Sequence, residues 1–261
     1  MNTSSHDSPM PPDCDYCLVV CAAGTGQRMG AQCKKPYLLL DDEPILFHTL
    51  RRLCECRGCR QIVLVLHQDE ADDLPSGWER RLRDEFGVDR ITAGGATRQE
   101  SAWRGIKLAS ESVDVVMTHD GVRPFVHTEV VEKVAREAAE HGAALAAIPA
   151  TATVKEVSRS GVVKRTHPRE DIWLAQTPQG FRRDLLMEAY QKALDAGFVG
   201  TDDAQILEWA GHEVRIVRDS KDNIKITTPH DIQVAESILS RQRKDCPQDF
   251  SDRIPRLIDR P

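Results

Sequence analysis

The sequence has no apolar run that approaches the roughly 20 residues needed to cross a bilayer. Its first fifteen residues, MNTSSHDSPMPPDCD, lack both the basic start and the apolar core of a secretory signal. An excess of basic charge is also missing, because the formal net charge is −6, and this argues against a general nucleic-acid surface. We therefore expect a cytoplasmic protein that binds neither a membrane nor nucleic acid.

Two common phosphate-binding loops are missing as well. A Walker A loop requires G-x-x-x-x-G-K-[ST], but Gly24 and Gly30 are one residue too far apart, and Ala31 and Gln32 follow in place of Lys-Ser/Thr. The dinucleotide fingerprint G-x-G-x-x-G requires a third glycine at position 29, where the chain has Met29. These absences exclude a P-loop NTPase and argue against an NAD(P) oxidoreductase.

The composition is that of an ordinary globular protein, with 40% hydrophobic and 29% charged residues in 261. That length favours one domain with an appendage. We expect a disordered leader over residues 1–15, a single domain over 16–240 and a flexible tail over 241–261, because both ends are polar and contain proline.

The eight cysteines of the chain allow a metal-binding alternative. Cys14 and Cys17 form C-x-x-C, and three more crowd into CECRGC at residues 54–59, so two pairs could hold zinc. We favour the alternative in which they pack as small hydrophobic residues, because Cys17 opens an apolar strand and Cys54 continues the apolar face of a helix. Disulfides are disfavoured in a reducing compartment.

A glycine-rich stretch organises the chain, and it reads LVVCAAGTGQRMGAQCKKPY over residues 18–37. Its apolar start at 18–20 predicts a buried strand, and the small residues 22–24 allow a tight turn. Gly26 lets backbone N–H groups approach an anion, and Arg28 and Lys35 add two cations. The stretch therefore predicts a polyanion site.

Alternating strands and helices up to residue 149 indicate a parallel sheet with helices on both of its faces. The predicted strands are 18–20, 62–66, 89–92, 113–117 and 143–148. Ligands bind at the carboxyl ends of such strands. The three loops 22–30, 94–101 and 119–124 all follow strands, so we expect them to share one site.

This rhythm breaks over residues 150–181, where short β-branched runs flank Ser160-Gly161 as in a β-hairpin. A two-stranded ribbon alone is marginal in water, so we expect this β-arm to pack on a second copy of the chain. Helices then follow from Asp184 and after Thr201, which we expect to cap the second. Further strands are predicted at 213–217 and 224–227, and Pro229 opens the last helix.

Asp120 ends a predicted strand in the segment His119-Asp120-Gly121-Val122-Arg123-Pro124. Mg²⁺ prefers one or two carboxylates together with phosphate oxygens, so Asp120 is a candidate magnesium ligand. A local ion pair with Arg123 is the competing interpretation. Further on, Asp222 and Lys225 place a carboxylate and a cation before the last predicted strand, with a turn residue and a solvated lysine as the alternatives.

Several of these segments together resemble one family, the 2-C-methyl-D-erythritol 4-phosphate cytidylyltransferases of the non-mevalonate isoprenoid pathway. The matching pieces, spread over residues 18 to about 240, are AAGTGQRMG, KKPY, GGATRQES, HDGVRP, PATATVKEV, the segment R-x-x-x-W-x-x-Q-T-P-Q from Arg169 to Gln179, Thr201-Asp202 and DNIKIT. The departures are Cys21 where the family usually has proline, Lys34 before Lys35, Gly121-Val122 where a small pair is common, and both tails.

The resemblance implies a mostly parallel, Rossmann-like nucleotidyltransferase sheet, a homodimer joined by the β-arm, and CTP, a polyol phosphate and Mg²⁺ or another divalent cation as ligands. The implied catalytic residues are Arg28, Lys35 and Lys225. The implied nucleotide-binding residues are Ala22, Ala23, Gly24, Thr25, Gly26, Gly94, Arg98, Ser101 and Asp120, the last also binding the metal. The implied substrate-binding residues are Arg123, Thr153, Lys155, Thr177 and Asp222, with Arg169 and Thr201 of the partner subunit.

Alternatives of three kinds remain open at this point. The same chemistry could act on another acceptor, such as ribitol 5-phosphate, because sequence alone does not shape the acceptor pocket. The chain could also be a nucleotide-binding protein without activity, although Arg28, Lys35 and Asp120 together argue against that. An NAD(P) oxidoreductase is disfavoured by the misplaced third glycine.

Overall fold

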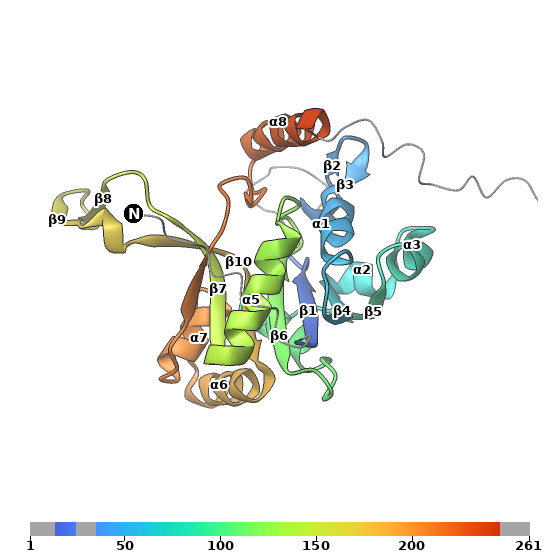
Figure 1. The fold of residues 1–261 in the computed structure, drawn as a ribbon, viewed down its shortest axis with the longest axis horizontal. Coiled ribbons are helices and arrows are strands. Elements are labelled where there is room, and N and C mark those ends of the chain that lie inside the picture. The colour runs from blue at the N-terminus through green and yellow to red at the C-terminus, as the bar shows by residue number, and fades with distance from the viewer. Residues whose placement is uncertain (1–13, 25–34, 246–261) are drawn as a thin grey trace, which may run out of the picture.

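A computed structural model describes residues 14–24 and 35–245 (Figure 1). The strands are β1 Tyr16–Cys21, β2 Leu39–Leu40, β3 Glu43–Pro44, β4 Cys59–Leu66, β5 Val88–Ala93, β6 Val115–Asp120, β7 Ala143–Pro149, β8 Val154–Val157, β9 Val163–His167, β10 Trp173–Arg182 and β11 Arg215–Arg218. The helices are α1 Ile45–Leu53, α2 Gln68–Asp72, α3 Trp78–Asp84, α4 Arg98–Ile106, α5 Thr128–His141, α6 Arg183–Ala196, α7 Asp203–Trp209 and α8 Pro229–Asp245, with 3₁₀ turns at Lys35–Tyr37 and Arg169–Asp171.

The central sheet has seven strands in the order β11-β7-β10-β6-β1-β4-β5. Strands β5, β4, β1 and β6 pair in parallel, and so do β7 and β11. Strand β10 lies between β6 and β7 and is antiparallel to both. The predicted mostly parallel sheet is therefore confirmed, with one inserted antiparallel strand.

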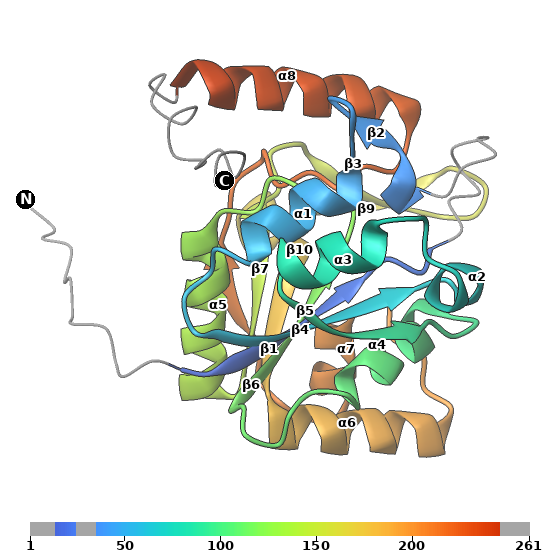
Figure 2. The ribbon, with the colours of Figure 1, turned by 90° about the vertical axis from the view of Figure 1, so that its right-hand side faces the viewer.

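Helices cover both faces of this sheet because successive strand residues point to opposite faces. On one face, Leu18 and Leu64 pack with side chains of α1 and α5. On the other face, Val19 and Val63 pack with side chains of α4, α6 and α7. Figure 2 shows the layer of α1 and α3 in front of the sheet, with α8 lying across the top.

A third, smaller apolar cluster joins α8 to the carboxyl edge of the sheet. Ala235 and Ile238 of α8 pack there with Leu40 of β2 and with Val122 and Phe125 of the loop after β6. This cluster fixes the loop that follows Asp120.

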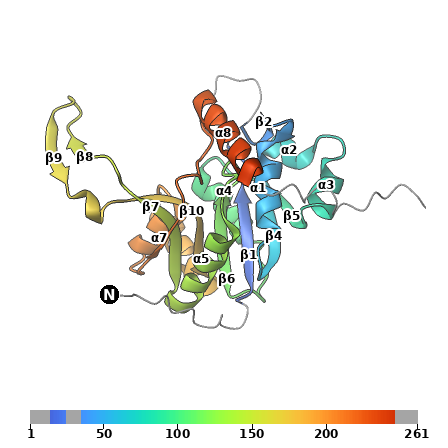
Figure 3. The ribbon, with the colours of Figure 1, turned by 45° about the horizontal axis from the view of Figure 1, so that its top comes forward.

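The β-arm is shorter than predicted. Residues 173–181 of the expected 150–181 range belong to β10, whose residues from Gln179 to Arg182 pair with β6 inside the sheet. The remaining residues, 150–172, form an outer segment in which β8 and β9 pair only with each other. This segment projects from the body of the molecule beside β7 and β10 (Figure 1, Figure 3).

Other sequence-based expectations also need correction. Residues 224–227 form no strand, because Ile226 donates a single backbone bond to Val122 O (3.0 Å) and its side chain packs in the third cluster. Asp202, not Thr201, caps α7, because its carboxylate accepts a bond from Gln205 N. The expected flexible tail from 241 begins within α8, which ends at Asp245.

The expected leader over 1–15 lies outside the described residues except for positions 14 and 15, and the tail lies outside them from 246. No helix within the described ranges is both long and apolar enough to cross a membrane.

Candidate functional site

Three loops leave the carboxyl edge of the sheet at the same level. Cys21, the last residue of β1, is in register with Asp120 of β6 and with Val65 of β4. Backbone bonds extend this register into the loops, from Ala22 N to Val65 O (2.8 Å) and from Gly121 N to Cys21 O (2.9 Å). The loop of small residues and the loop after Asp120 therefore lie side by side.

The third loop, which follows β5, lies against the loop after β1 at Gly94. The N–H of Gly94 donates to Leu66 O (2.7 Å). A Cβ built on Gly94 would lie 2.4 Å from Cβ of Ala23 and 2.8 Å from Oγ of Ser101. No side chain fits at this position, so only glycine allows the two loops to approach this closely.

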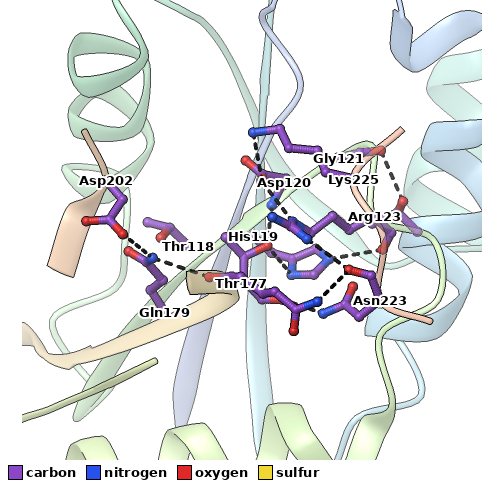
Figure 4. A network of polar contacts seen from close by, with 12 residues as sticks. Thr118, His119, Asp120, Gly121, Arg123, Thr177, Gln179, Asp202, Asn223 and Lys225 are labelled. Carbon is purple, nitrogen blue, oxygen red and sulfur yellow. Dashed lines mark hydrogen bonds and ion pairs between the residues drawn. The ribbon is translucent and has the colours of Figure 1, made fainter. Parts of the chain in front are cut away.

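Asp120 is buried and faces two cations. Nε of Arg123 and Nζ of Lys225 each lie 3.0 Å from Oδ2 of Asp120 (Figure 4). Burial opposes ionisation of Asp120, but the charges of Lys225, Arg123 and Arg98 outweigh it and hold its pKa well below the usual value. Two cations against one carboxylate leave an excess of positive charge, which suits phosphate groups.

A closed set of hydrogen bonds fixes the backbone of Asp120. His119 Nε2 lies 3.2 Å from Arg123 O, and because a carbonyl only accepts, this nitrogen carries the proton. The other ring nitrogen, Nδ1, then accepts from the Thr177 hydroxyl (3.1 Å), whose oxygen accepts from Asp120 N (3.1 Å). Burial lowers the pKa of His119 to about 4, so the ring is neutral at pH 7.

Asn223 ties this loop to the segment that carries Lys225. Its Nδ2 donates to Thr177 O (2.8 Å) and to Oδ2 of Asp219 (2.6 Å). The backbone carbonyl of Asn223 accepts from Nη1 of Arg123 (2.8 Å) and from Nε2 of Gln176 (3.1 Å). Arg123 is thereby oriented by two partners and lies with its charge toward Asp120.

Arg98 forms a second ion pair, with the buried carboxylate of Asp203. Its guanidinium donates two parallel bonds to the carboxylate of Asp203, Nη1 to Oδ1 (3.0 Å) and Nη2 to Oδ2 (2.9 Å). Oδ2 also accepts from Thr118 Oγ1 (2.6 Å), and Oδ1 accepts from the Tyr190 hydroxyl (2.5 Å). Burial opposes ionisation of Asp203, but Arg98 and the two hydroxyls outweigh it and lower its pKa.

Gln179 locks the start of α7 onto β10. Its Oε1 accepts from the backbone N–H groups of Asp203 (3.1 Å) and Ala204 (3.0 Å). Its Nε2 donates to Oδ2 of Asp202 (2.9 Å), whose Oδ1 accepts from Gln205 N (2.9 Å). Both carboxylates at this helix start therefore have fixed positions.

The glycine-containing loop after β5 leads into a well-capped helix. Oγ1 of Thr97 accepts from Glu100 N (3.1 Å) at the start of α4. Oγ of Ser101 accepts from Gly95 N (3.0 Å) and donates to Thr97 O (2.8 Å). These bonds place Arg98, the first residue of α4, at the carboxyl edge of the sheet.

The family model described as IspD: 2-C-methyl-D-erythritol 4-phosphate cytidylyltransferase matches residues 16–241 of this chain. The chain belongs to the IspD family.

Relatives with this name support the assignment over most of the chain. The cytidylyltransferase of Bacillus cereus is 40% identical over 232 residues, which is 88% of this chain and 100% of the relative. That of Syntrophus aciditrophicus is 42% identical over 229 residues, 86% of this chain and 95% of the relative.

Solved structures agree with the fold. The crystal structure of 4-diphosphocytidyl-2C-methyl-D-erythritol synthase from Anaerococcus prevotii superposes with a TM-score of 0.76 at 30% identity, covering 87% of this chain and 96% of that one. The 2-C-methyl-D-erythritol 4-phosphate cytidylyltransferase from Thermus thermophilus gives 0.72 at 30% identity, covering 87% and 99%. The predicted nucleotidyltransferase sheet is thus confirmed.

Within this IspD-family chain, the structure brings together eight predicted site residues at the carboxyl edge. They come from the loops after β1, β5 and β6, from β10 and from the segment before α8: Ala22, Ala23, Gly94, Arg98, Asp120, Arg123, Thr177 and Lys225. The hydroxyl of Thr177 bonds within the protein, to Asp120 N and His119. Its structural role is thus to hold the Asp120 backbone in place.

Other predicted residues lie apart from this group. Thr153, Lys155 and Arg169 lie on the outer segment, where Lys155 Nζ bonds Thr166 Oγ1 (2.7 Å) and Arg169 Nη1 bonds Thr151 O (3.2 Å). Thr201 is exposed just before α7.

Asp222 pairs with α8 instead of the site. Its Oδ2 accepts from Nη2 of Arg241 (2.7 Å), in an ion pair on the surface of the molecule. The carboxylate therefore anchors the last helix beside the segment that carries Lys225.

Part of the predicted phosphate loop lies outside the described residues. This holds for Thr25, Gly26, Arg28 and the side chain of Lys35, whose backbone begins the 3₁₀ turn at Lys35–Tyr37. Gly24 is exposed at the end of the described part of the loop.

Cys21, which departs from the family pattern, adds no charge to the site. Burial raises the pKa of its thiol to about 12, so it is protonated at pH 7. Cys21 ends β1, and the charges of both ion pairs, Arg98 with Asp203 and Asp120 with Lys225, act on the pKa of its thiol.

The sequence motifs did not predict the roles of His119, Gln179, Asp203 and Asn223. His119, Gln179 and Asn223 occur inside motifs that carried the resemblance, namely HDGVRP, QTPQ and DNIKIT, and Asp203 directly follows the matching pair Thr201-Asp202. Each of these polar residues lies within two positions of a predicted ligand-binding residue. This proximity was the signal in the sequence that could have indicated a role at the site.

One carboxylate at the site suits a divalent cation. Both cations approach Oδ2 of Asp120, and no described residue pairs with its Oδ1. Among the residues that the structure describes, no three His, Cys, Asp or Glu side chains converge on a possible metal position. An ion here would need phosphate oxygens and water as further ligands, which is the coordination that Mg²⁺ prefers.

Proposed function

We propose that this chain joins CTP and 2-C-methyl-D-erythritol 4-phosphate to give 4-diphosphocytidyl-2-C-methyl-D-erythritol and pyrophosphate, a step of isoprenoid precursor biosynthesis. One observation carries the proposal: the ionised Asp120, with Arg123 and Lys225 3.0 Å from its Oδ2, lies beside the small-residue loop after β1. The match to the IspD family over residues 16–241 supports the same reaction.

The reaction needs charge neutralisation and positioning more than proton transfer. An oxygen of the acceptor phosphate attacks the α-phosphorus of CTP in line, a new P–O bond forms, and the bond to the β-phosphate breaks with pyrophosphate as the leaving group. The attacking phosphate oxygen is already an anion, so no general base is required. The neutral His119, with both ring nitrogens bonded inside the protein, fits this absence of base catalysis.

The cations of the chain stabilise the charge that develops during transfer. We assign Arg28 and Lys35 to the triphosphate and Arg123 and Lys225 to the acceptor phosphate, with Lys225 also stabilising the charge that develops in the reaction. Single well-placed charge stabilisers contribute roughly 2.7 to 4 kcal/mol to such reactions. Gly24, Gly26 and Thr25 would present backbone N–H groups to the same phosphates.

Asp120 would hold Mg²⁺ or another divalent cation through Oδ1, with the CTP phosphates as further ligands. The ion, when bound, supplies a Lewis acid that offsets the negative charge of the triphosphate. The low pKa of Asp120 supports this role, because the carboxylate stays ionised over the working range of pH.

The acceptor would be held between two subunits. The exposed outer segment carries Thr153, Lys155 and Arg169, which lie apart from the Asp120 site of their own chain. We propose a homodimer in which each acceptor pocket is completed by two residues of the other chain, the partner's Arg169 and the partner's Thr201. Exposed Val157 and Val163 on the segment support a protein contact there.

Pyrophosphate release tests the reaction directly. CTP is incubated with 2-C-methyl-D-erythritol 4-phosphate or with ribitol 5-phosphate, each with and without Mg²⁺. We expect release only with the methylerythritol phosphate and only with the metal. Faster release with ribitol 5-phosphate would assign the alternative acceptor, and no release with either would refute the transferase proposal.

Mixed dimers test whether the outer segment acts on the partner. Asp120→Asn and Arg169→Ala chains are unfolded together, refolded in equal amounts and assayed at acceptor concentrations well below KM, where the first alone is nearly inactive and the second alone keeps about a tenth of wild-type activity. If Arg169 serves the partner's site, half of the dimers are mixed and each has one intact site, so about a quarter of wild-type activity returns. Absence of any recovery would place Arg169 in its own chain's site or outside catalysis.

We also propose that the protein acts in the cytoplasm, where CTP is made and thiols stay reduced. The six described cysteines are all free thiols. Cell fractionation with an antibody against the chain tests this, and recovery with the membrane or exported fraction would contradict it.

A further inference from the structure

The carboxylate of Asp203 is the most enclosed charged group at the carboxyl edge of the sheet. It is 0% exposed, whereas the guanidinium side chain of Arg98 that it binds is 33% exposed. A charge this deep is costly unless it is paired and fully hydrogen-bonded. Its placement therefore calls for a physical reason.

All of the bonding capacity of Asp203 is used inside the protein. Each oxygen accepts one bond from Arg98 and one hydroxyl bond, from Tyr190 on Oδ1 and from Thr118 on Oδ2. Burial, together with the charge of Asp203, raises the pKa of Tyr190, so that hydroxyl stays protonated and donates. Asp203 therefore cannot touch a substrate, and any effect it has passes through Arg98.

Arg98 is the first residue of α4, at the carboxyl edge of the sheet, and a third of its side chain is exposed there. Its positive charge lowers the pKa of Asp120 and acts on Cys21, both at the carboxyl ends of their strands. Two parallel bonds to Asp203 fix the plane of the guanidinium and leave three of its five N–H donors for a ligand.

The same network holds the segment whose Thr201 is proposed to complete the acceptor pocket of the other subunit. Gln179 binds the N–H of Asp203 and the carboxylate of Asp202, directly after Thr201. A movement of residues 201–203 would therefore also shift the Asp203 carboxylate to which Arg98 is bonded.

We infer that Asp203 is a positioning residue, which holds Arg98 toward the nucleotide and couples it to the Thr201–Asp203 segment. This inference rests on the proposed function, because the nucleotide contact of Arg98 belongs to it. Nothing in the sequence motif alone distinguishes Asp203 from its neighbour Asp202, which caps α7.

Asp203→Asn tests the inference in the full-length protein. It keeps the size of the side chain and removes the charge that orients Arg98. We expect the KM for CTP and the Kd for CTP, measured by equilibrium dialysis, to rise about tenfold, since small misplacements of binding groups are costly. The KM for the acceptor and kcat should change less.

Asp184→Asn is the matched control. Asp184 also accepts two bonds from one arginine, Arg182 (3.2 and 2.9 Å), but at the opposite edge of the sheet, where Arg182 pairs with Val115. Its KM and Kd for CTP should equal those of the wild type.

The double variant Arg98→Met/Asp203→Asn separates positioning from structural support. If Asp203 acts through Arg98, the second change adds nothing to the rise in Kd caused by Arg98→Met. Full additivity, or an Asp203→Asn variant with a lower Tm and an unchanged Kd for CTP, would overturn the inference.

A milder variant keeps the test decisive if Asp203→Asn fails to fold. Tyr190→Phe removes only the 2.5 Å bond to Oδ1 and should raise the Kd for CTP in the same direction by a smaller factor, whereas an unchanged Kd would count against the inference. Wild-type protein that binds CTP but releases no pyrophosphate would overturn the proposed reaction alone, because the Kd comparison needs no acceptor.

Discussion

The buried ion pairs at the carboxyl edge and the exposed outer segment carry residues assigned to one reaction, yet their construction is opposite. Asp120 and Asp203 are buried and each is held by several partners from distant elements. On the outer segment, Val157 and Val163 are 53% and 54% exposed, and β8 pairs only with β9. One region is completed by its own chain, and the other offers groups that a second chain would complete.

The charges of the two regions also differ in effect. Glu156 on β8 faces Lys164 at 4.0 Å with both side chains about half exposed, and such surface pairs contribute little to stability. The Arg123–Asp120 pair is buried, where water screens it poorly and removal of one partner leaves an unpaired charge. Substitutions at the sheet edge should therefore act through charge, whereas those on the outer segment should act through association.

The largest expected effect comes from Asp120→Asn. This change leaves the shape of the site and removes the charge that pairs with Arg123 and Lys225 and would bind the metal. We expect kcat/KM to fall by about 10² to 10³, as for loss of one strong charge stabiliser. Asp89→Asn, which affects a carboxylate bonded to Ile62 N, is the control; an Asp120→Asn enzyme as active as this control would refute the assignment.

Acid should destabilise the sheet edge through His119. In the unfolded chain His119 binds a proton below about pH 6.5, but in the folded protein it does so only near pH 4. Between these two values the unfolded state holds more protons than the folded state. The free energy of unfolding therefore decreases as the pH is lowered from about 6.5 to 4. The free energy of unfolding should drop by roughly 3 kcal/mol from this residue alone.

Urea unfolding of the wild type and of His119→Gln between pH 4 and 7 measures this effect. The variant should lose that part of the slope, although other histidines still titrate in both proteins. The depressed pKa values of Asp120 and Asp203 contribute only below about pH 4, their unfolded range. Equal slopes for the two proteins would show that His119 is not held neutral.

On the outer segment, Arg169→Ala should raise the KM for the acceptor about tenfold, which corresponds to about 1.4 kcal/mol of lost binding. The KM for CTP should not change, since the nucleotide is held at the sheet edge. Arg159→Ala, an exposed arginine of the same segment, is the matched control. An unchanged KM for the acceptor would remove Arg169 from the pocket.

The smallest effect on folding is expected for Val163→Ser. The side chain is already exposed, so the free energy of unfolding of one chain should change by no more than about 0.5 kcal/mol. The dimer should nevertheless dissociate at a higher protein concentration, measured by light scattering. A wild-type monomer at working concentration would contradict the proposed dimer outright.

Local motifs predicted the parts of the site that follow strands directly. Asp120 and the small residues after β1 were placed correctly, because the carboxyl ends of parallel strands share an edge. The family resemblance and the mostly parallel sheet were confirmed too. The pairing of Arg98 with Asp203 was not predicted, because these residues are 105 positions apart and only the topology of the sheet brings them together.

The position of β10 was the main error in the predicted fold. Its sequence, WLAQTPQGFR, has neither a continuous apolar run nor clear alternation, so periodicity gave no sign of a buried strand. Residues 224–227 were mistaken in the opposite way: Ile224 and Ile226 alternate as in a strand but pack in the third cluster instead. Local pattern does not distinguish these cases, because burial there is decided by distant neighbours.

The insertion of β10 between β6 and β7 has a consequence for synthesis on the ribosome. Strands β6 and β7 do not pair with each other, and both pair with β10, so they stay unconnected until residues 173–182 have been synthesised. Until then both strands present open edges, which are prone to pairing with other chains. A nascent chain halted before Trp173 should therefore require chaperone protection, whereas in one extended past Arg182 strand β10 covers both of these edges, and only the edge of β7 that later pairs with β11 stays open.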